Sequence, residues 1–488
     1  MPLPRRRASA GGLVRPRAAT RARTAAAALT AVLALSTGAR GQSPPEAPPL
    51  EGSVPPEEVA HTTLVHPPFS HTLGIHRARP IHLKLFLADR TRFDDPQGLA
   101  AVKFDSDDDP DVKSDDFRLT LFGVNSGRGE IVFNSTMQTL ALYGGRGSGE
   151  GRFQTPHGIA ATVDGRIYVA DTGNRRIARL RWDPAARGLT WIGEWPVGEP
   201  FDVAADGRGQ VYVTDRSDST VRRFADPSVG GAPSPVEGDR WPLPDDVSAP
   251  LGLAVGDSLE RWYRPRHYRL YLVDRDGARL RAYDAGGAVV AETSPMAVYG
   301  DRGGAAGRFL YVELDYFGNV YVSDPVAGAV AKLTPDLAPL DVFSGPGGRG
   351  QALDEPRGVA IWRRFGQVFV AEREGAQYFF VGADFEVDDP LLVREEEGGA
   401  ALELFLTEAA EVAVAFLDGA GDTLAVADTG TWPAGPVTVR WSAARWREPP
   451  SGGWRERAGT VRIEARPTYS SRRKFSRVRD AELATGGS

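Results

Sequence analysis

The sequence predicts an all-β protein, with a six-bladed β-propeller followed by a small β-sandwich. Three observations indicate this fold. A unit of 44 to 59 residues recurs six times between residues 94 and 384. Each unit alternates apolar side chains with the period of a half-buried strand, and helical periodicity is absent. Gly and Pro are abundant, at 56 and 37 of the 488 residues, which suits a chain with many turns.

The first 41 residues predict a signal peptide. They carry eight Arg and no acidic residue, and seven of these Arg precede the apolar run 24–35. A basic region, a short apolar run and then small residues are typical of a secretory signal. A disordered Ala/Arg tail or an unconventional transit segment is the alternative. We therefore expect an exported protein, in the periplasm, at the cell surface or outside the cell. The 53 Arg against 5 Lys suggest a GC-rich bacterial genome.

Charge and composition exclude several classes of function. Without residues 1–41, 50 basic residues face 64 acidic ones, a net charge of −14. A nucleic-acid partner needs a basic face, so we expect none. The chain has no Cys, which excludes disulfides, thiolate metal sites and cysteine nucleophiles. After residue 41 no apolar stretch is long enough to span a bilayer, so we expect no membrane span.

Residues 42–79 are predicted to be a linker ahead of the repeats. Residues 43–58 are rich in Pro and Glu, a composition that favours an extended chain. Four of the seven His follow at intervals of five residues, at His61, His66, His71 and His76. This spacing does not keep side chains on one face of a strand or a helix. We interpret them as an incidental His-bearing lead-in, with transition-metal capture as the alternative.

The repeats extend over residues 80–386. In each unit a β-run ends at an acidic or amide residue that can close a tight turn, at Asn125, Asp171, Asp215, Asp274, Asp324 and Glu372. A run crowded with small residues precedes each of them, which suits a strand close to a central axis. Residues 80–88 alternate apolar side chains without such a run. We predict that they form the outer strand of the last blade and close the ring.

The remaining chain predicts a second module. Residues 387–399 form a charged linker, and residues 400–470 contain four alternating runs with Gly, Asp and Pro turns. This pattern indicates a small β-sandwich. Residues 471–488 are basic and then small and polar, and are predicted to be a flexible tail.

Two resemblances refine these predictions. Residues 155–180, TPHGIAATVDGRIYVADTGNRRIARL, resemble the NHL repeat, and the resemblance covers roughly residues 80–385. It implies an NHL-type propeller, a fold that serves as enzyme, receptor or scaffold. Segments 411–424, 432–441 and 472–478 resemble the Ig-like domain of flagellar hook-capping proteins and of Por-type secretion sorting domains. They imply an Ig-like sandwich that sorts or anchors the protein, although the family's Trp-Asp-Gly is absent.

The NHL resemblance also defines candidate residues at the channel mouth. The peptidyl-hydroxyglycine amidating lyase, which this repeat resembles, holds zinc with three His that follow the Pro of the first run. The equivalent positions here are Gln97, His157, Phe201, Leu251, Leu310 and Arg357. One imidazole cannot hold a catalytic zinc, so that lyase is excluded. Gln97, His157 and Arg357 are instead a candidate ligand-binding patch. The alternative for His157 is a bond to backbone or water.

Acidic residues supply two further candidates. Glu313 stands where the repeat has Ala, and is a candidate ligand-binding residue; pairing with a neighbouring Arg or a backbone donor is the alternative. The spacing of five other acids follows positions 1, 3, 5, 7 and 12 of a calcium loop, at Asp105, Asp107, Asp109, Asp111 and Asp116. Pro110 stands where that loop has Gly, and a solvated acidic loop is the alternative. Apart from calcium, we expect no cofactor.

These observations favour a non-enzymatic binding or scaffold protein. One face of the propeller would recognise a protein, a peptide or a glycan, because its loops are displayed on a rigid frame. The alternative is a metal-assisted lyase or hydrolase that acts in the channel. The sequence contains no Gly-x-Ser-x-Gly, His-Glu-x-x-His or phosphate-loop motif. The oligomeric state is not predicted.

Overall fold

The computed structural model describes residues 65–66, 77–109, 111, 118–137, 139–229, 239–256, 263–265, 267–300, 307–344, 353–364, 366–396, 399–450, 452–468 and 476–484. The predicted signal peptide, most of residues 42–79 and Asp116 lie outside these ranges. Within them the chain is almost entirely β-structure. No helix in this part of the chain is both long and apolar enough to cross a bilayer.

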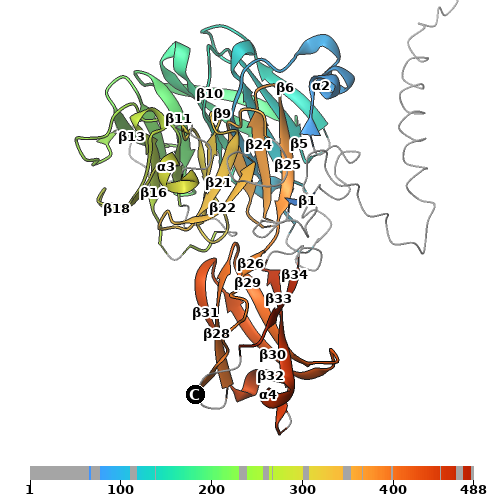
Figure 1. The fold of residues 1–488 in the computed structure, drawn as a ribbon. Coiled ribbons are helices and arrows are strands. Elements are labelled where there is room, and N and C mark those ends of the chain that lie inside the picture. The colour runs from blue at the N-terminus through green and yellow to red at the C-terminus, as the bar shows by residue number, and fades with distance from the viewer. Residues whose placement is uncertain are drawn as a thin grey trace, which may run out of the picture. The chain divides into compact units, whose positions relative to one another are not determined.

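From β3 to β25 the described residues form six consecutive antiparallel sheets, and the strands of this range follow the order of the chain within each sheet (Figure 1). The first sheet contains β3 (Pro96–Val102), β4 (Thr120–Asn125), β5 (Glu130–Ser135) and β6 (Thr139–Gly144). The second contains β7 (Ile159–Ala161), β8 (Arg166–Asp171), β9 (Arg176–Asp183) and β10 (Gly188–Pro196). The third contains β11 (Pro200–Ala205), β12 (Gln210–Asp215), β13 (Thr220–Ala225) and β14 (Asp239–Arg240). The fourth contains β15 (Leu253–Val255), β16 (Leu270–Asp274), β17 (Arg279–Tyr283) and β18 (Val289–Thr293). The fifth contains β19 (Val312–Leu314), β20 (Val320–Asp324), β21 (Ala329–Leu333) and β22 (Pro339–Ser344). The sixth includes β23 (Val359–Trp362), β24 (Gln367–Glu372) and β25 (Gly375–Val381).

Short helices connect some of these strands. They are α2 (Pro80–Leu87) and α3 (Pro295–Tyr299), with 3₁₀ turns η3 (Ala88–Arg90), η4 (Asp105–Asp107), η6 (Ser126–Arg128), η7 (Thr172–Asn174) and η8 (Arg275–Gly277). The all-β prediction is therefore confirmed.

The acidic residues that end the second strands are buried and well partnered. Asp215 accepts a hydrogen bond from Ser217 N–H (3.1 Å), just ahead of it, as the sequence predicts. It also accepts from Glu199 N–H (2.9 Å), which precedes the first strand of the same sheet. Asp171 likewise accepts from Gln154 N–H (2.8 Å) and pairs with Arg176 (2.9 Å). Each acid thus also ties the loop before its sheet to the end of its strand.

Glycines at the start of the first strands let neighbouring sheets approach closely. Gly98 N–H donates to the carbonyl oxygen of His157 (3.0 Å), and Gly252 N–H donates to that of Leu310 (2.9 Å). A Cβ atom on Gly358 would lie 2.4 Å from the carbonyl oxygen of Gln97, so the sixth sheet meets the first in the same way. The repeat therefore requires Gly at this position because neighbouring sheets come into close contact there, and not because the backbone angle is unusual.

The prediction for residues 80–88 is wrong, because residues 80–87 form helix α2. Pro80 occupies its first turn, where the missing N–H costs nothing. Leu83 and Leu87, four residues apart, are buried, whereas Ile81 and Leu85 are 62% and 69% exposed. This burial follows a helical period. The sixth sheet is completed instead by two short strands upstream, β1 (Val65–His66) and β2 (Arg77–Ala78), which both pair with β25.

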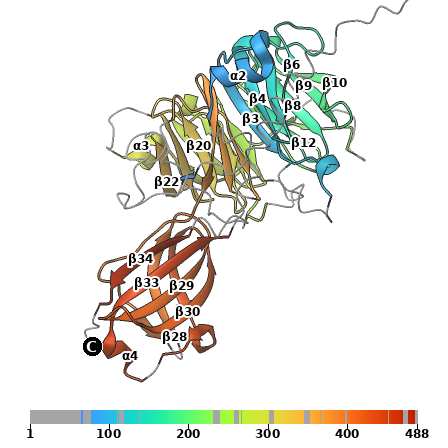
Figure 2. The ribbon, with the colours of Figure 1, turned by 90° about the vertical axis from the view of Figure 1, so that its right-hand side faces the viewer.

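The C-terminal part is a sandwich of two antiparallel sheets, whose strands β29, β30, β33 and β34 are labelled in Figure 2. One sheet contains β26 (Phe385–Glu386), β27 (Arg394–Glu396), β28 (Gly399–Leu406) and β31 (Gly435–Trp441). The other contains β29 (Ala410–Asp418), β30 (Thr423–Trp432), β32 (Trp446–Glu448), β33 (Ala458–Pro467) and β34 (Arg477–Glu482), with η9 (Ala443–Arg445) and α4 (Trp454–Arg457) between strands. Both sheets contribute to one apolar core. The sandwich extends beyond the predicted range 400–470, because β26 lies in the range predicted for the propeller, β27 in the predicted linker and β34 in the predicted tail.

Candidate functional site

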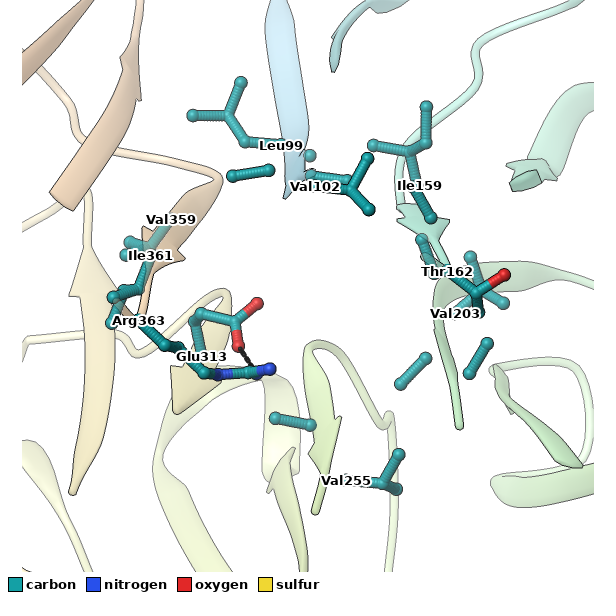
Figure 3. A pocket seen from close by; sticks show the side chains of 18 of the residues that line it. Leu99, Val102, Ile159, Thr162, Val203, Val255, Glu313, Val359, Ile361 and Arg363 are labelled. Atoms are coloured by element: carbon teal, nitrogen blue, oxygen red, sulfur yellow. Dashed lines mark hydrogen bonds and ion pairs between the residues drawn. The ribbon is translucent and has the colours of Figure 1, made fainter. Parts of the chain in front are cut away.

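The first strands of the six sheets surround a pocket of about 200 Å³ (Figure 3). Charged side chains line part of it, at Lys103, Asp105, Asp108, Glu313 and Arg363. Small and β-branched residues of the strands line much of the rest. Those labelled in Figure 3 include Val102, Ile159, Val203, Val255, Val359 and Ile361. A concave pocket in which a few polar groups converge beside apolar walls is the usual form of a ligand site.

An ion pair projects into this pocket. Arg363, just after β23, donates from Nη2 to Oε1 of Glu313 at 2.7 Å (Figure 3). The Arg363 Nε also donates to the carbonyl oxygen of Leu314 (2.7 Å), and its guanidinium lies 5.0 Å from the ring centre of Tyr263. The Glu313 and Arg363 side chains remain 25% and 15% exposed. A ligand in the pocket can therefore reach both charges.

Glu313 was a candidate from the sequence, and pairing with an Arg was the alternative for it. The structure shows that pairing. Arg363 was not predicted, because it directly follows the strand, outside the repeat pattern, and lies 50 positions from Glu313. The only signal in the sequence for Arg363 is that a basic residue follows the first β-run of the sixth unit.

Aromatic side chains fill the other end of the channel, where the Pro-x-Gly motifs lie. Tyr311 stands at a Gly position of the repeat, and its hydroxyl donates to Oε1 of Gln97 (3.1 Å). Its ring stacks on Phe201 with centres 5.5 Å apart, and Phe201 lies 4.9 Å from the ring centre of His157. Burial raises the pKa of Tyr311 well above its usual value, so the hydroxyl stays protonated. Residues of the first, second, third and fifth sheets thus meet at this end.

The three predicted channel-mouth residues lie at this filled end and already have partners. Arg357 forms an ion pair with Asp95, and the amide of Gln97 donates to the same carboxylate (3.0 Å). The Nδ1 atom of His157 lies 2.8 Å from the Thr172 hydroxyl, which itself donates to the carbonyl oxygen of Pro200 (2.6 Å). His157 therefore donates from Nδ1.

Burial lowers the pKa of His157 to about 4, although the nearby charge of Asp95 acts to raise it. The imidazole is therefore neutral at pH 7. Of the predicted residues, Gln97 and Arg357 are linked to each other, because both bind the carboxylate of Asp95. His157 and Glu313 each have separate partners, and Glu313 belongs to the pocket.

Asp202, also at a Gly position, is a buried acid in the wall of the pocket. Its Oδ1 accepts from Val203 N–H (2.9 Å) and its Oδ2 from Leu253 N–H (3.0 Å) in the next sheet. Burial raises the pKa of Asp202 to about 8, and the charge of Glu313 adds to the shift. Asp202 thus stands where other units of the repeat have the glycine that contacts the next sheet.

The predicted calcium loop is only partly described. Asp105 and Asp108 line the pocket, and Asp108 forms an ion pair with Lys103. Asp109 accepts a hydrogen bond from Asp111 N–H (3.0 Å). Burial and neighbouring acids raise the pKa of Asp105. In the part of the chain that the structure describes, no three His, Asp or Glu residues are placed to hold a metal ion.

Comparison with known proteins identifies an NHL repeat at residues 153–180. NHL repeat-containing protein 3 of Homo sapiens is 34% identical over 65 residues, which cover 13% of this chain and 18% of that protein. The chain thus matches less than a fifth of that relative's length.

Among solved structures, the chain is similar to virginiamycin B lyase from Staphylococcus aureus, at 13% identity and a TM-score of 0.36, over 54% of this chain and 77% of the lyase. It is similar to a gluconolactonase from Xanthomonas campestris, at 13% identity and a TM-score of 0.41, over 66% of this chain and 98% of that one. These values do not transfer an activity to this chain. The repeat and the described sheets support an NHL β-propeller.

Proposed function

We propose that this NHL β-propeller is a six-bladed ring in an exported, non-enzymatic binding protein, and that the channel pocket receives its ligand. The observation that carries the proposal is the Glu313–Arg363 pair, which stays partly exposed inside the pocket beside apolar side chains. The ligand enters from the side of Asp105 and Asp108, because Tyr311 and Phe201 fill the opposite end.

The pocket favours an end group of a glycan over the peptide or protein alternatives. Glu313 accepts and Arg363 donates hydrogen bonds side by side, which matches the hydroxyl groups along one edge of a sugar ring. The apolar walls match its C–H face. A nucleic acid is disfavoured, because the chain is acidic overall and the basic residues of the pocket, Lys103 and Arg363, are each paired with an acid.

The C-terminal sandwich has a supporting role in this proposal. We propose that it is Ig-like and that it sorts or anchors the exported protein in the periplasm, at the cell surface or outside the cell. Two sheets packed on a common core support the first part. The resemblance to hook-capping and Por-type sorting domains supports the second.

Glu313→Gln is expected to weaken glycan binding by about tenfold or more, because a charge-assisted hydrogen bond is lost. A glycan array identifies the ligand, and isothermal titration calorimetry compares the variants. Asp480→Asn is the matched control, since Asp480 also pairs with an Arg at 2.7 Å but on the exposed sandwich surface. An array without any bound glycan, or equal affinities for Glu313→Gln and Asp480→Asn, would contradict the proposal.

The enzymatic alternative, a metal-assisted lyase or hydrolase, is favoured by one observation. Asp202, with its raised pKa, and Glu313 line the same pocket. Two carboxyl groups in different environments can act as general acid and general base.

Elemental analysis of protein purified without chelator separates these two functions. We expect substoichiometric zinc and other transition metals, and a melting temperature that EDTA does not change. Stoichiometric transition metal would instead support the enzyme. Stoichiometric calcium with a calcium-dependent melting temperature would support the predicted loop, and Asp107→Ala should then abolish that dependence.

A further inference from the structure

A second cavity lies beneath helix α2, where the first and sixth sheets meet. Its volume is about 180 Å³, and its walls come from α2, β4, β5, β6, β24 and β25. They include Leu83, Phe86, Leu121, Val132, Leu140 and Phe369. The adjoining core is also shared between the two sheets, since Leu119 and Met137 pack with Trp362 and Phe369.

The described residues of the cavity wall include no Asp, Glu, Lys or Arg, and their one basic side chain is His82, whose Nδ1 accepts a hydrogen bond from Arg79 N–H (3.0 Å). Two other polar side chains of the wall are also paired. Asn125 donates from Nδ2 to the carbonyl oxygen of Arg92 (2.8 Å), and Gln377 donates from Nε2 to Glu372 (2.7 Å). A charged ligand is therefore disfavoured, because the wall offers it no carboxylate, Lys or Arg as a counter-charge.

Two other polar atoms in the wall are buried and have no hydrogen-bond partner among the described residues. They are the hydroxyl of Tyr378 and Oδ1 of Asn134. Tyr378 is 8% exposed, and its ring is held against Phe369 with centres 5.3 Å apart. Burial raises the pKa of Tyr378, so its hydroxyl can both donate and accept. Buried polar groups are normally paired, so these atoms indicate a missing partner.

We propose that this cavity binds a small uncharged molecule with an apolar body and one hydroxyl group, such as a phenol. The hydroxyl group pairs with Tyr378, and the ring packs against Phe86, Val132 and Leu140. The volume supports this class, because an apolar cavity of about 150 Å³ in another protein holds benzene. The site is distinct from the channel pocket and does not depend on the function proposed there.

The test measures binding of p-cresol, toluene and benzoate to the full protein by isothermal titration calorimetry. We expect p-cresol to bind about threefold to tenfold more tightly than toluene, the usual range for one hydrogen bond. Benzoate should not bind at the same concentrations, because it is charged. Val132→Phe should abolish binding by filling the cavity.

Tyr378→Phe should remove the preference for p-cresol over toluene and leave toluene binding unchanged. Tyr283→Phe is the matched control, because Tyr283 is a fully buried tyrosine of β17 in the fourth sheet. It should change neither affinity. Circular dichroism checks the folding of each variant. Tyr378→Phe keeps the ring, so it decides the proposal even when Val132→Phe does not fold.

Two results would overturn the proposal. If p-cresol does not bind, or binds a folded Val132→Phe variant as well as the unchanged protein, the cavity is not the site. If p-cresol keeps its preference over toluene in Tyr378→Phe, the hydroxyl of Tyr378 does not recognise the ligand.

Discussion

Lys332→Met is expected to lower the free energy of unfolding by about 3–5 kcal/mol, the usual cost of removing one partner from a buried ion pair. Lys332 of β21 donates to Oε2 of Glu408 at 2.6 Å and to the carbonyl oxygen of Thr407 at 2.7 Å. Both charged side chains are fully buried. Burial raises the pKa of nearby Asp315 to about 7, and the charge of Glu408 adds to this while Lys332 opposes it. The variant leaves two buried carboxyl groups without their cation.

Denaturant unfolding at pH 7 measures this loss. Lys332→Met combined with Glu408→Gln should recover most of it, because the uncompensated charge is removed. Arg462→Met is the matched control, since Arg462 pairs with Asp480 on an exposed surface and should cost at most about 1 kcal/mol.

The loss in Lys332→Met should also depend on pH. Burial and the charge of Glu408 raise the pKa of Asp315 in the folded state, and the loss of the opposing Lys332 charge raises it further, so the folded variant binds more protons than the unfolded one. Stability of the variant then falls as pH rises, so its loss should be smaller at pH 5 than at pH 8. A pH-independent loss, or one no larger than that of Arg462→Met, would contradict this account.

Gly252→Val is expected to cost about 3 kcal/mol, at the upper end of the usual range for overpacking. A Cβ atom at this position would lie 2.4 Å from the carbonyl oxygen of Leu310 and 2.7 Å from Cα of Tyr311. Both neighbours are backbone atoms, so no side-chain rotation relieves the contact. The hydrogen bond from Gly252 N–H to Leu310, 2.9 Å long, would also be strained.

Thermal and denaturant unfolding compare this variant with Gly419→Val. Gly419 lies in an exposed turn, and its Cβ atom would meet nothing within 4 Å. Its replacement should change stability by less than about 0.5 kcal/mol. Equal losses for the two variants would show that Gly252 matters only through chain entropy, and would contradict the argument that close contact between sheets requires glycine.

The sequence predicted features that depend on short segments. The alternation of apolar residues and the acidic ends at Asp171 and Asp215 predicted strands that the structure contains, because strand period and turn chemistry are properties of neighbouring residues. Residues 80–88 show the limit of this reasoning. Their alternation matched a strand, but Pro80 and the burial of Leu83 and Leu87 on one side produced a helix.

The candidate site was less predictable, because its contacts join residues far apart in the chain. The repeat pattern singled out Glu313 as an unexpected acid, but its partner Arg363 lies 50 residues away. Tyr311 reaches Gln97 over 214 residues, and Lys332 reaches Glu408 over 76.

The sequence by itself therefore determined the β-class of the chain, the repeat and the residues of unusual type. Only the tertiary structure decided that Gln97, His157 and Arg357 are engaged at a filled end of the channel while Glu313 faces the pocket. The physical reason is that strand pattern and turns are local. The distance and orientation between side chains of different sheets follow from how those sheets pack.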